Sequence, residues 1–115
     1  MSYKVFLSRS FKRSLKSLLK RFPHAKDDVS LALGEVVQTP TLGVMVPKSG
    51  GVRKVRVRSS DMPKGKSGGF RLLYLVLSDR RLICPLLVYA KSEREDVTIR
   101  EIRALLADLA QDLEP

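Results

Sequence analysis

Basic and apolar side chains alternate along residues 53–58. In a β-strand this alternation places Lys54, Arg56 and Arg58 on one face and the two valines between them on the other. Like charges that lie side by side repel one another, so such a row is stable only where water solvates it or a polyanion binds it. Because a row of fixed cations suits successive phosphates, the pattern indicates a nucleic-acid partner.

Further basic residues lie in the segments that follow this predicted strand. Arg71 comes directly after Gly68-Gly69-Phe70 and begins the next predicted strand, and Lys91 follows the last strand. If consecutive strands pair, Arg71 lies beside the basic row and extends it across two strands. The remaining candidate contacts with nucleic acid are Arg53, Arg58, Lys64, Lys66 and Tyr89.

The sequence Gly65-Lys66-Ser67 resembles part of a nucleotide-binding phosphate loop. The residue five positions before Gly65 is Ser60 rather than glycine, however, and a strand rather than a helix is predicted to follow. These two differences exclude a nucleotide-binding loop. The glycines and lysines instead predict a basic hairpin loop, which either is simply solvated or approaches a phosphodiester backbone.

Clustered lysines and arginines can promote RNA cleavage without a metal ion. The 2′-hydroxyl attacks its own phosphate if one group removes its proton, others stabilise the phosphorane and another protonates the departing 5′-oxygen. Neighbouring arginines disfavour the charged form of a lysine, so Lys54 is the candidate base, while guanidinium groups at Arg56 and Arg71 bind phosphate oxygens.

The sequence has no cluster of histidines and cysteines, and we expect no metal or other cofactor. The single histidine, His24, falls in a predicted turn, where a surface or capping role is expected.

The whole chain is strongly basic. It has 22 lysines and arginines against 12 acidic residues, a formal net charge of +10, which is typical of proteins that bind nucleic acid or an anionic surface.

Its 115 residues, 43% of them apolar, predict one domain spanning residues 1–115. The longest apolar run, 82–90, is too short to cross a membrane, and residues 1–4 lack the apolar core of a signal peptide, so we expect a soluble cytoplasmic protein. Cys84 lies within this run and is expected to be buried as a small apolar residue.

Periodicity along the chain predicts an α+β fold with the element order β-α-α-β-β-β-β-α. Two segments with apolar residues at helical spacing lie between Ser8, which can cap the first, and Pro40, which ends the second, and they predict a helical hairpin. Thr98 and Glu101 form a capping box that begins a third helix. Pro85 predicts a bulge or an edge in the last strand. The predicted strands are residues 3–7, 43–46, 52–58, 70–77 and 82–89, the last four forming an antiparallel meander.

Three segments resemble the RelE/ParE superfamily of toxins, with the HigB-like branch as the nearest group. They are the basic strand with Gly50-Gly51 before it, residues 65–74 with their Gly-Gly-Phe-Arg sequence, and Tyr89-Ala90-Lys91-Ser92-Glu93. The resemblance covers essentially the whole chain and implies a RelE-like toxin domain. It implies the toxin of a type II toxin-antitoxin pair, which enters the ribosomal A site and cleaves mRNA there without a metal. Its partners would be mRNA on the ribosome and a small antitoxin encoded beside it, with no membrane partner.

The resemblance also implies site residues. In RelE-like enzymes the working groups are basic residues on the central strands, the arginine of a Gly-aromatic-Arg sequence, a basic residue after the last strand and a tyrosine near the C-terminal end. Ser92 stands where RelE carries an arginine, and Thr98 stands where it carries the tyrosine, so the general acid is not identified. The residues that match as catalytic groups are Lys54, Arg56, Arg71 and Lys91.

Two other functions fit the sequence. A ParE-like inhibitor of DNA gyrase would share the fold but act on another target, and the set of Lys54, Arg56 and Arg71 disfavours it. A non-catalytic nucleic-acid-binding module would bind somewhat more weakly after Lys54→Ala and would have no cleavage to lose. A less favoured alternative treats the basic first helix as a membrane-surface element, but core packing explains its apolar stripe.

Overall fold

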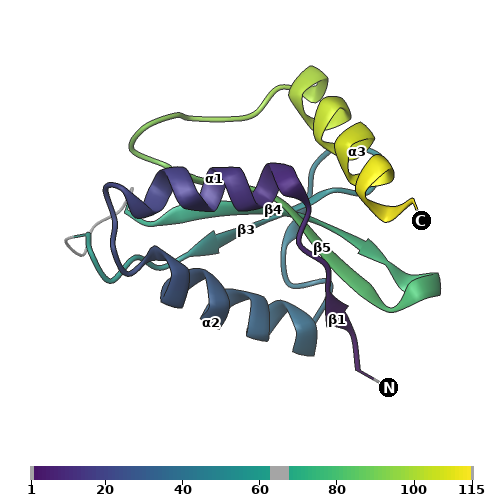
Figure 1. Cartoon of the computed structure of the whole chain (residues 1–115), viewed down its shortest axis with the longest axis horizontal. Coiled ribbons are helices and arrows are strands. Elements are labelled where there is room, and N and C mark those ends of the chain that lie inside the picture. The colour runs from purple at the N-terminus through teal and green to yellow at the C-terminus, as the bar shows by residue number, and fades with distance from the viewer. Residues whose placement is uncertain (1, 63–67, 115) are drawn as a thin grey trace.

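The computed structural model describes residues 2–62 and 68–114. Within these residues the element order is the predicted one, and the α+β fold class is confirmed (Figure 1). The predicted first strand is shortened to two residues. The elements are β1 (Lys4–Val5), α1 (Arg9–Leu19), α2 (Ala25–Gln38), β2 (Val44–Met45), β3 (Arg53–Val57), β4 (Phe70–Leu77), the 3₁₀ turn η1 (Ser78–Arg80), β5 (Leu82–Ala90) and α3 (Ile99–Leu113).

The strands form one sheet in the order β1-β5-β4-β3-β2. Strands β2 to β5 make the antiparallel meander that the sequence predicts. Strand β1 joins the opposite edge and runs parallel to β5, and the backbone N–H groups of Lys4 and Phe6 donate to the carbonyls of Arg81 and Ile83, both at 2.9 Å. Both edge strands have only two residues, so little unpaired backbone is left for edge-to-edge association.

A bulge interrupts the pairing of β4 with β5 near Pro85. The register changes from Leu73 opposite Leu87 to Tyr74 opposite Pro85, which leaves Leu86 as the additional residue. Proline has no N–H to donate to a strand ladder, and the bulge accommodates this missing donor. The predicted bulge is therefore confirmed. Strand β5 lies between β1 and β4, but β1 pairs only with Leu82 and Ile83, so it does not extend to Pro85.

Local hydrogen bonds fix where the helices begin. The Ser8 hydroxyl accepts from the backbone N–H of Phe11 at 3.2 Å and caps α1, and Thr98 and Glu101 form the predicted capping box of α3. These bonds satisfy backbone donors that the first turn of a helix leaves unpaired. Among the helices of residues 2–62 and 68–114, none combines the length and hydropathy needed to span a bilayer.

Helices cover both faces of the sheet. We call the side covered by α1 and α2 the hairpin face, and the side covered by α3 the α3 face. One cluster of buried residues on the hairpin face comprises Phe11, Leu18, Ala25, Val29, Ala32, Val57, Phe70, Leu72, Val88 and Ala90, and a smaller cluster comprises Val36, Tyr74 and Ile83. The buried residues of the α3 face are Val52, Leu73, Cys84, Leu86, Tyr89, Val97, Ile102 and Leu109.

Cys84 is fully buried within the α3-face cluster. Burial raises the pKa of its thiol to about 11. Since the thiolate is the reactive form, Cys84 is unreactive near neutral pH, and the predicted role as a small buried residue is confirmed.

Tyr74 links β4 to the segment that follows α2. Its hydroxyl donates to the carbonyl of Pro40 and accepts from the N–H of Gly43, both at 2.8 Å, and the side chain is fully buried. We expect Tyr74→Phe to lower the free energy of unfolding by about 2 kcal/mol, because it leaves both backbone groups unpaired. Urea denaturation measures the difference, with Tyr3→Phe as the matched control. A loss no larger than that of the control would show that these bonds do not stabilise the fold.

Candidate active site

The α3 face carries a row of candidate residues across three strands. In the strand register Arg56 lies opposite Arg71, and Arg71 lies opposite Tyr89. Lys54 lies two residues before Arg56 and opposite Leu73, and therefore projects from the same face. Directly opposed residues have Cβ atoms about 5 Å apart, and same-face neighbours along a strand are about 7 Å apart. Long cationic side chains at these separations can converge on one phosphodiester group.

The three cationic side chains of this row are exposed or partly exposed. Arg56 is exposed, Arg71 is half-buried, and the side chain of Lys54 is 35% exposed. A guanidinium nitrogen of Arg71 donates to the carbonyl of Phe70 at 3.2 Å. Partly buried stems with accessible charged groups present cations to a ligand without burying an unpaired charge.

An acidic side chain lies beside Lys54. The Nζ atom of Lys54 is 3.5 Å from Oδ1 of Asp96, and that carboxylate also accepts from the backbone N–H of Val97 at 2.8 Å. The hydrogen bond from Val97, together with the charges of Lys54 and Lys91, holds the pKa of Asp96 below its usual range. The Asp96 side chain is 74% exposed, and exposed ion pairs are weak in water. A phosphate group would therefore compete well with Asp96 for Lys54.

Tyr89 ends the row and is buried, with 6% of its surface exposed. The guanidinium of Arg94 lies over its ring, 5.3 Å from the centroid, and donates to both carboxylate oxygens of Glu101 at 2.8 Å. Burial and the charge of Asp96 raise the pKa of the Tyr89 phenol, and its hydroxyl has no hydrogen-bond partner in the described part of the chain. Because Arg94 covers one side of the ring, Tyr89 does not offer that side for stacking on a base. Its role in RNA binding stays a prediction.

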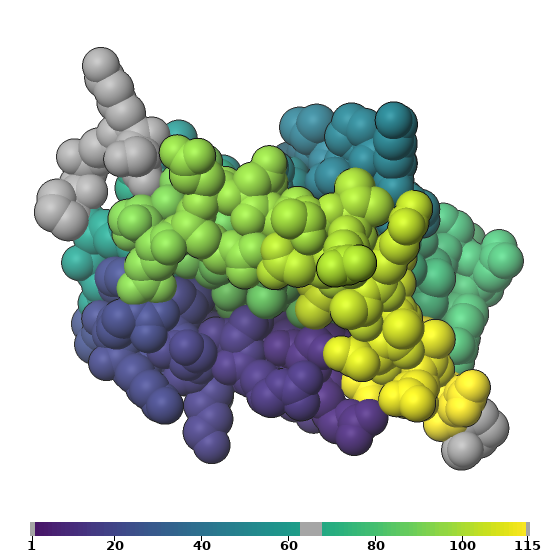
Figure 2. Space-filling view, turned by 90° about the horizontal axis from the view of Figure 1, so that it is seen from above, coloured from purple at the N-terminus to yellow at the C-terminus, as the bar shows by residue number. Residues whose placement is uncertain are grey.

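Lys91 lies directly after β5. Its backbone N–H donates to the carbonyl of Gly69 at 3.2 Å, and its ammonium group donates to the carbonyl of Glu95 at 3.0 Å. Residues 91–98 then lead to α3, and they lie beside that helix on the side of the molecule seen in Figure 2. Arg56 and Arg71, which lie opposite each other, form what we call the arginine row. Along the strand direction this row lies between Lys54 and Lys91.

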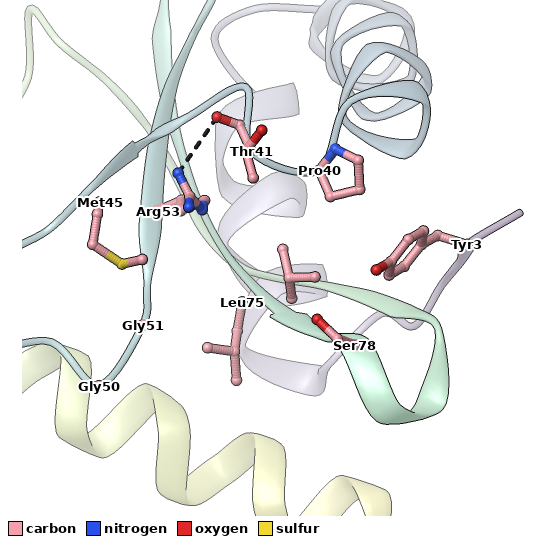
Figure 3. Close-up of a pocket in the computed structure, with 10 residues that line it drawn as sticks. Tyr3, Pro40, Thr41, Met45, Gly50, Gly51, Arg53, Leu75 and Ser78 are labelled. Atoms are coloured by element: carbon pink, nitrogen blue, oxygen red, sulfur yellow. Dashed lines mark hydrogen bonds between the residues drawn. The ribbon is translucent and has the colours of Figure 1, made fainter.

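Arg53 projects from the hairpin face instead. It lies opposite Tyr74 in the register, and a guanidinium nitrogen donates to the carbonyls of Gly43 at 2.7 Å and Thr41 at 3.4 Å. It lines a pocket of about 310 Å³, to which Met45 also contributes (Figure 3). Lys54, Arg56 and Arg71 do not line this pocket. The structure therefore separates Arg53 from Lys54, Arg56 and Arg71, which lie on an open surface.

Three further candidates belong to the β3–β4 connection. Arg58 lies just beyond the end of β3 and is exposed. Lys64 and Lys66 lie outside the described residues. Their roles in RNA binding stay predictions.

The start of the β3–β4 connection is tied to the N-terminus of α2. The Asp61 carboxylate accepts from the backbone N–H of His24 at 2.8 Å and lies 2.6 Å from its ring Nδ1. Ser60 donates its backbone N–H to Asp28 at 2.9 Å. The His24 side chain is 63% exposed, so its predicted surface position is confirmed.

We expect the stability contributed by the His24–Asp61 pair to depend on pH. The hydrogen bond with Asp61 raises the pKa of His24, and the hydrogen bond with His24 lowers the pKa of Asp61. The stabilisation that comes from the raised pKa of His24 is complete below about pH 6.5 and is lost as the pH rises through the folded-state pKa of His24. The stabilisation that comes from the lowered pKa of Asp61 is present above about pH 4 and is lost as the pH falls through the folded-state pKa of Asp61. The melting temperature of the native protein should therefore exceed that of His24→Gln most at about pH 5 and less above about pH 7. A difference that is constant over this range would contradict the expectation.

Two residues of this site are absent from the sequence-based set. Asp96 contacts Lys54 across 42 residues of sequence, and Arg94 covers Tyr89. The capping box at Thr98 was a local signal that the chain turns before α3, but no local pattern pairs Asp96 with a lysine on β3. The Thr98 hydroxyl accepts from the backbone N–H of Glu101 at 3.1 Å, so it serves the helix cap.

Comparison with known structures gives the fold. No family model matches the sequence. The structure is similar to the toxin RelE of Escherichia coli in the free state, in a form carrying two arginine-to-alanine substitutions, with a TM-score of 0.60 and 18% sequence identity over 99% of this chain and 100% of that chain. It is also similar to a chain of the toxin-antitoxin complex RelBE2 from Mycobacterium tuberculosis, with a TM-score of 0.58 and 22% identity over 78% of this chain and 99% of that chain. The chain has the fold of RelE toxins, as the sequence resemblance implied, and a nearer relation to HigB stays a prediction.

Proposed function

We propose that this protein is the toxin of a type II toxin-antitoxin system and an endoribonuclease that cleaves mRNA on the ribosome. The observation that carries the proposal is the strand register, which places Lys54, Arg56 and Arg71 together on an open face of a RelE-type fold. An open cationic surface suits a polymer with a phosphate backbone better than an enclosed pocket does. The proposed function requires no cofactor.

The proposed reaction is an attack of the ribose 2′-hydroxyl on the adjacent phosphate. Lys54 in its neutral form accepts the proton of the 2′-hydroxyl, while Arg56 and Arg71 bind the phosphate oxygens and stabilise the charge of the phosphorane. The bond between the 2′-oxygen and phosphorus forms and the bond to the 5′-oxygen breaks. The products are a 2′,3′-cyclic phosphate and a 5′-hydroxyl.

We assign Lys91 to protonating the departing 5′-oxygen. An in-line displacement needs its base and its acid on opposite sides of the phosphorus, and the arginine row separates Lys54 from Lys91 along the strand direction. Lys91 in its charged form carries the proton that the leaving oxygen takes up.

The proposed protein partner is a small antitoxin. The RelBE2 structure that this chain resembles is a toxin-antitoxin complex, which supports a partner of the same kind here. The net charge of +10 favours an acidic antitoxin, because opposite charge accelerates association and selects the partner.

Primer extension on a defined mRNA in a purified translation reaction tests the proposal. Cleavage is expected with ribosomes and not without them, and a 2′-deoxy substitution at the cleaved nucleotide should prevent it. Cleavage of the deoxy substrate would refute the proposed attack by the 2′-hydroxyl, and cleavage without ribosomes would indicate a free ribonuclease. A supercoiling assay with DNA gyrase serves as a parallel reaction, and inhibition there without mRNA cleavage would favour the ParE-like alternative.

A further inference from the structure

Three lysines follow one another along the outer side of α1. Lys12, Lys16 and Lys20 are spaced four residues apart, so they lie on one side of the helix at intervals of about 6 Å. We call these three residues the lysine stripe. All three are exposed, and none forms an ion pair with any residue in the ranges 2–62 and 68–114.

Helix stability explains the lysine stripe only in part. Lys16 lies in the last turn of α1 and Lys20 at its C-cap, where the helix dipole favours positive charge. Lys12 lies instead at the end of the first turn, which contains no acidic residue although the dipole favours negative charge there. Neighbouring lysines at this spacing also repel one another. In contrast, Arg9 in the same helix forms an ion pair with Asp112 of α3, and Arg21 just beyond the helix forms one with Glu93. The unpaired lysines are therefore free to bind a polyanion.

The surroundings of the lysine stripe indicate which polyanion. The apolar residues Phe11 and Leu18 of α1 are buried against the sheet, and the exposed residues of the helix are all polar. A protein interface has an apolar centre and a membrane-surface helix inserts an apolar face, but contact with a phosphate backbone needs only cations. A nucleic-acid backbone fits this surface best.

We propose that the lysine stripe is a second RNA-binding surface, which contacts the phosphate backbone of structured RNA and takes no part in cleavage. Helix α1 packs on the hairpin face, whereas Lys54, Arg56 and Arg71 project from the α3 face, so the stripe and these three residues lie on opposite sides of the sheet. The proposal rests on the proposed function, because ribosomal RNA is the structured RNA that surrounds a protein bound inside the ribosome.

Removing the charges of the lysine stripe should weaken binding without slowing the chemical step. The test compares the triple variant Lys12→Gln, Lys16→Gln and Lys20→Gln with a control that loses the same charge elsewhere, Lys4→Gln, Arg80→Gln and Arg103→Gln. Affinity for ribosomes that carry a defined mRNA is measured at several KCl concentrations. We expect the stripe variant to lose about tenfold or more in affinity and its log–log salt slope to become shallower by about 2, while the control changes less. Cleavage at saturating protein should stay equal to the native rate.

The outcomes separate this proposal from the proposed function. Binding is also measured to purified ribosomal RNA, so the stripe can be tested even if no cleavage occurs. Equal affinities and salt slopes of the stripe and control variants would overturn the proposal, as would a slower cleavage step at saturation. Unchanged RNA binding together with lost binding to vesicles of phosphatidylglycerol and phosphatidylcholine would overturn it as well, and would assign the stripe to a lipid surface.

Discussion

Lys54→Ala is expected to lower kcat for cleavage of ribosome-bound mRNA by at least about a hundredfold, because it removes the proposed general base. The fold should be unaffected, since the side chain of Lys54 is 35% exposed and contacts an exposed carboxylate. Single-turnover cleavage at saturating toxin measures the chemical step. Urea denaturation of the same protein measures the free energy of unfolding, which should change by less than about 0.5 kcal/mol.

Lys26→Ala is the matched control, because Lys26 is an exposed lysine of α2. It should cleave at the native rate. Arg71→Lys adds a second comparison, since it keeps the charge of the arginine row but loses the two-pronged contact with phosphate oxygens. A kcat for Lys54→Ala close to that of Lys26→Ala would refute the assigned base, and a loss confined to KM would make Lys54 a binding residue.

Phe70→Ala is expected to lower the free energy of unfolding by about 3 to 5 kcal/mol, which is a large part of the stability of a domain of this size. Phe70 is fully buried at the start of β4, and its ring meets that of Phe22 edge to face at a centroid distance of 5.4 Å. The substitution leaves a cavity between β4 and the helical hairpin. Urea denaturation measures the loss.

Leu31→Ala is the matched control for this core substitution, because Leu31 is 75% exposed on α2. It should change the free energy of unfolding by less than about 0.5 kcal/mol. Equal effects of the two substitutions would contradict the packing of the hairpin face. Phe70 also precedes Arg71 in β4, so its packing helps to hold that arginine in register with Arg56.

Much of the fold was predictable because its signals are local. The alternation of residues 53–58 identified a strand and assigned Lys54 and Arg56 to one face, and the register confirms that face. Ser8 and the Thr98–Glu101 capping box marked two helix starts, because these side chains bond to backbone groups within three residues. Pro85 marked the bulge because proline lacks a donor wherever it occurs.

The candidate site was predictable only in part. Arg71 was expected beside the basic row, and antiparallel pairing of consecutive strands places it opposite Arg56. Arg53 was expected to bind RNA together with the other candidates, but the register places it on the face of the valines, away from Lys54 and Arg56. Asp96 and Arg94 were not foreseen as neighbours of Lys54 and Tyr89, because those contacts form only when the segment after β5 returns over the sheet.

The sequence by itself determined the element order, the helix caps, the bulge and the side of β3 that carries the cations, since each depends on periodicity or on bonds between near neighbours. The tertiary structure decided that β1 joins β5 in parallel, that Asp96 lies beside Lys54, and that the lysine stripe and the arginine row lie on opposite sides of the sheet. These contacts join residues far apart in the chain. Their physical cause is the packing of α1, α2 and α3 against the two apolar faces of one sheet, which no local pattern specifies.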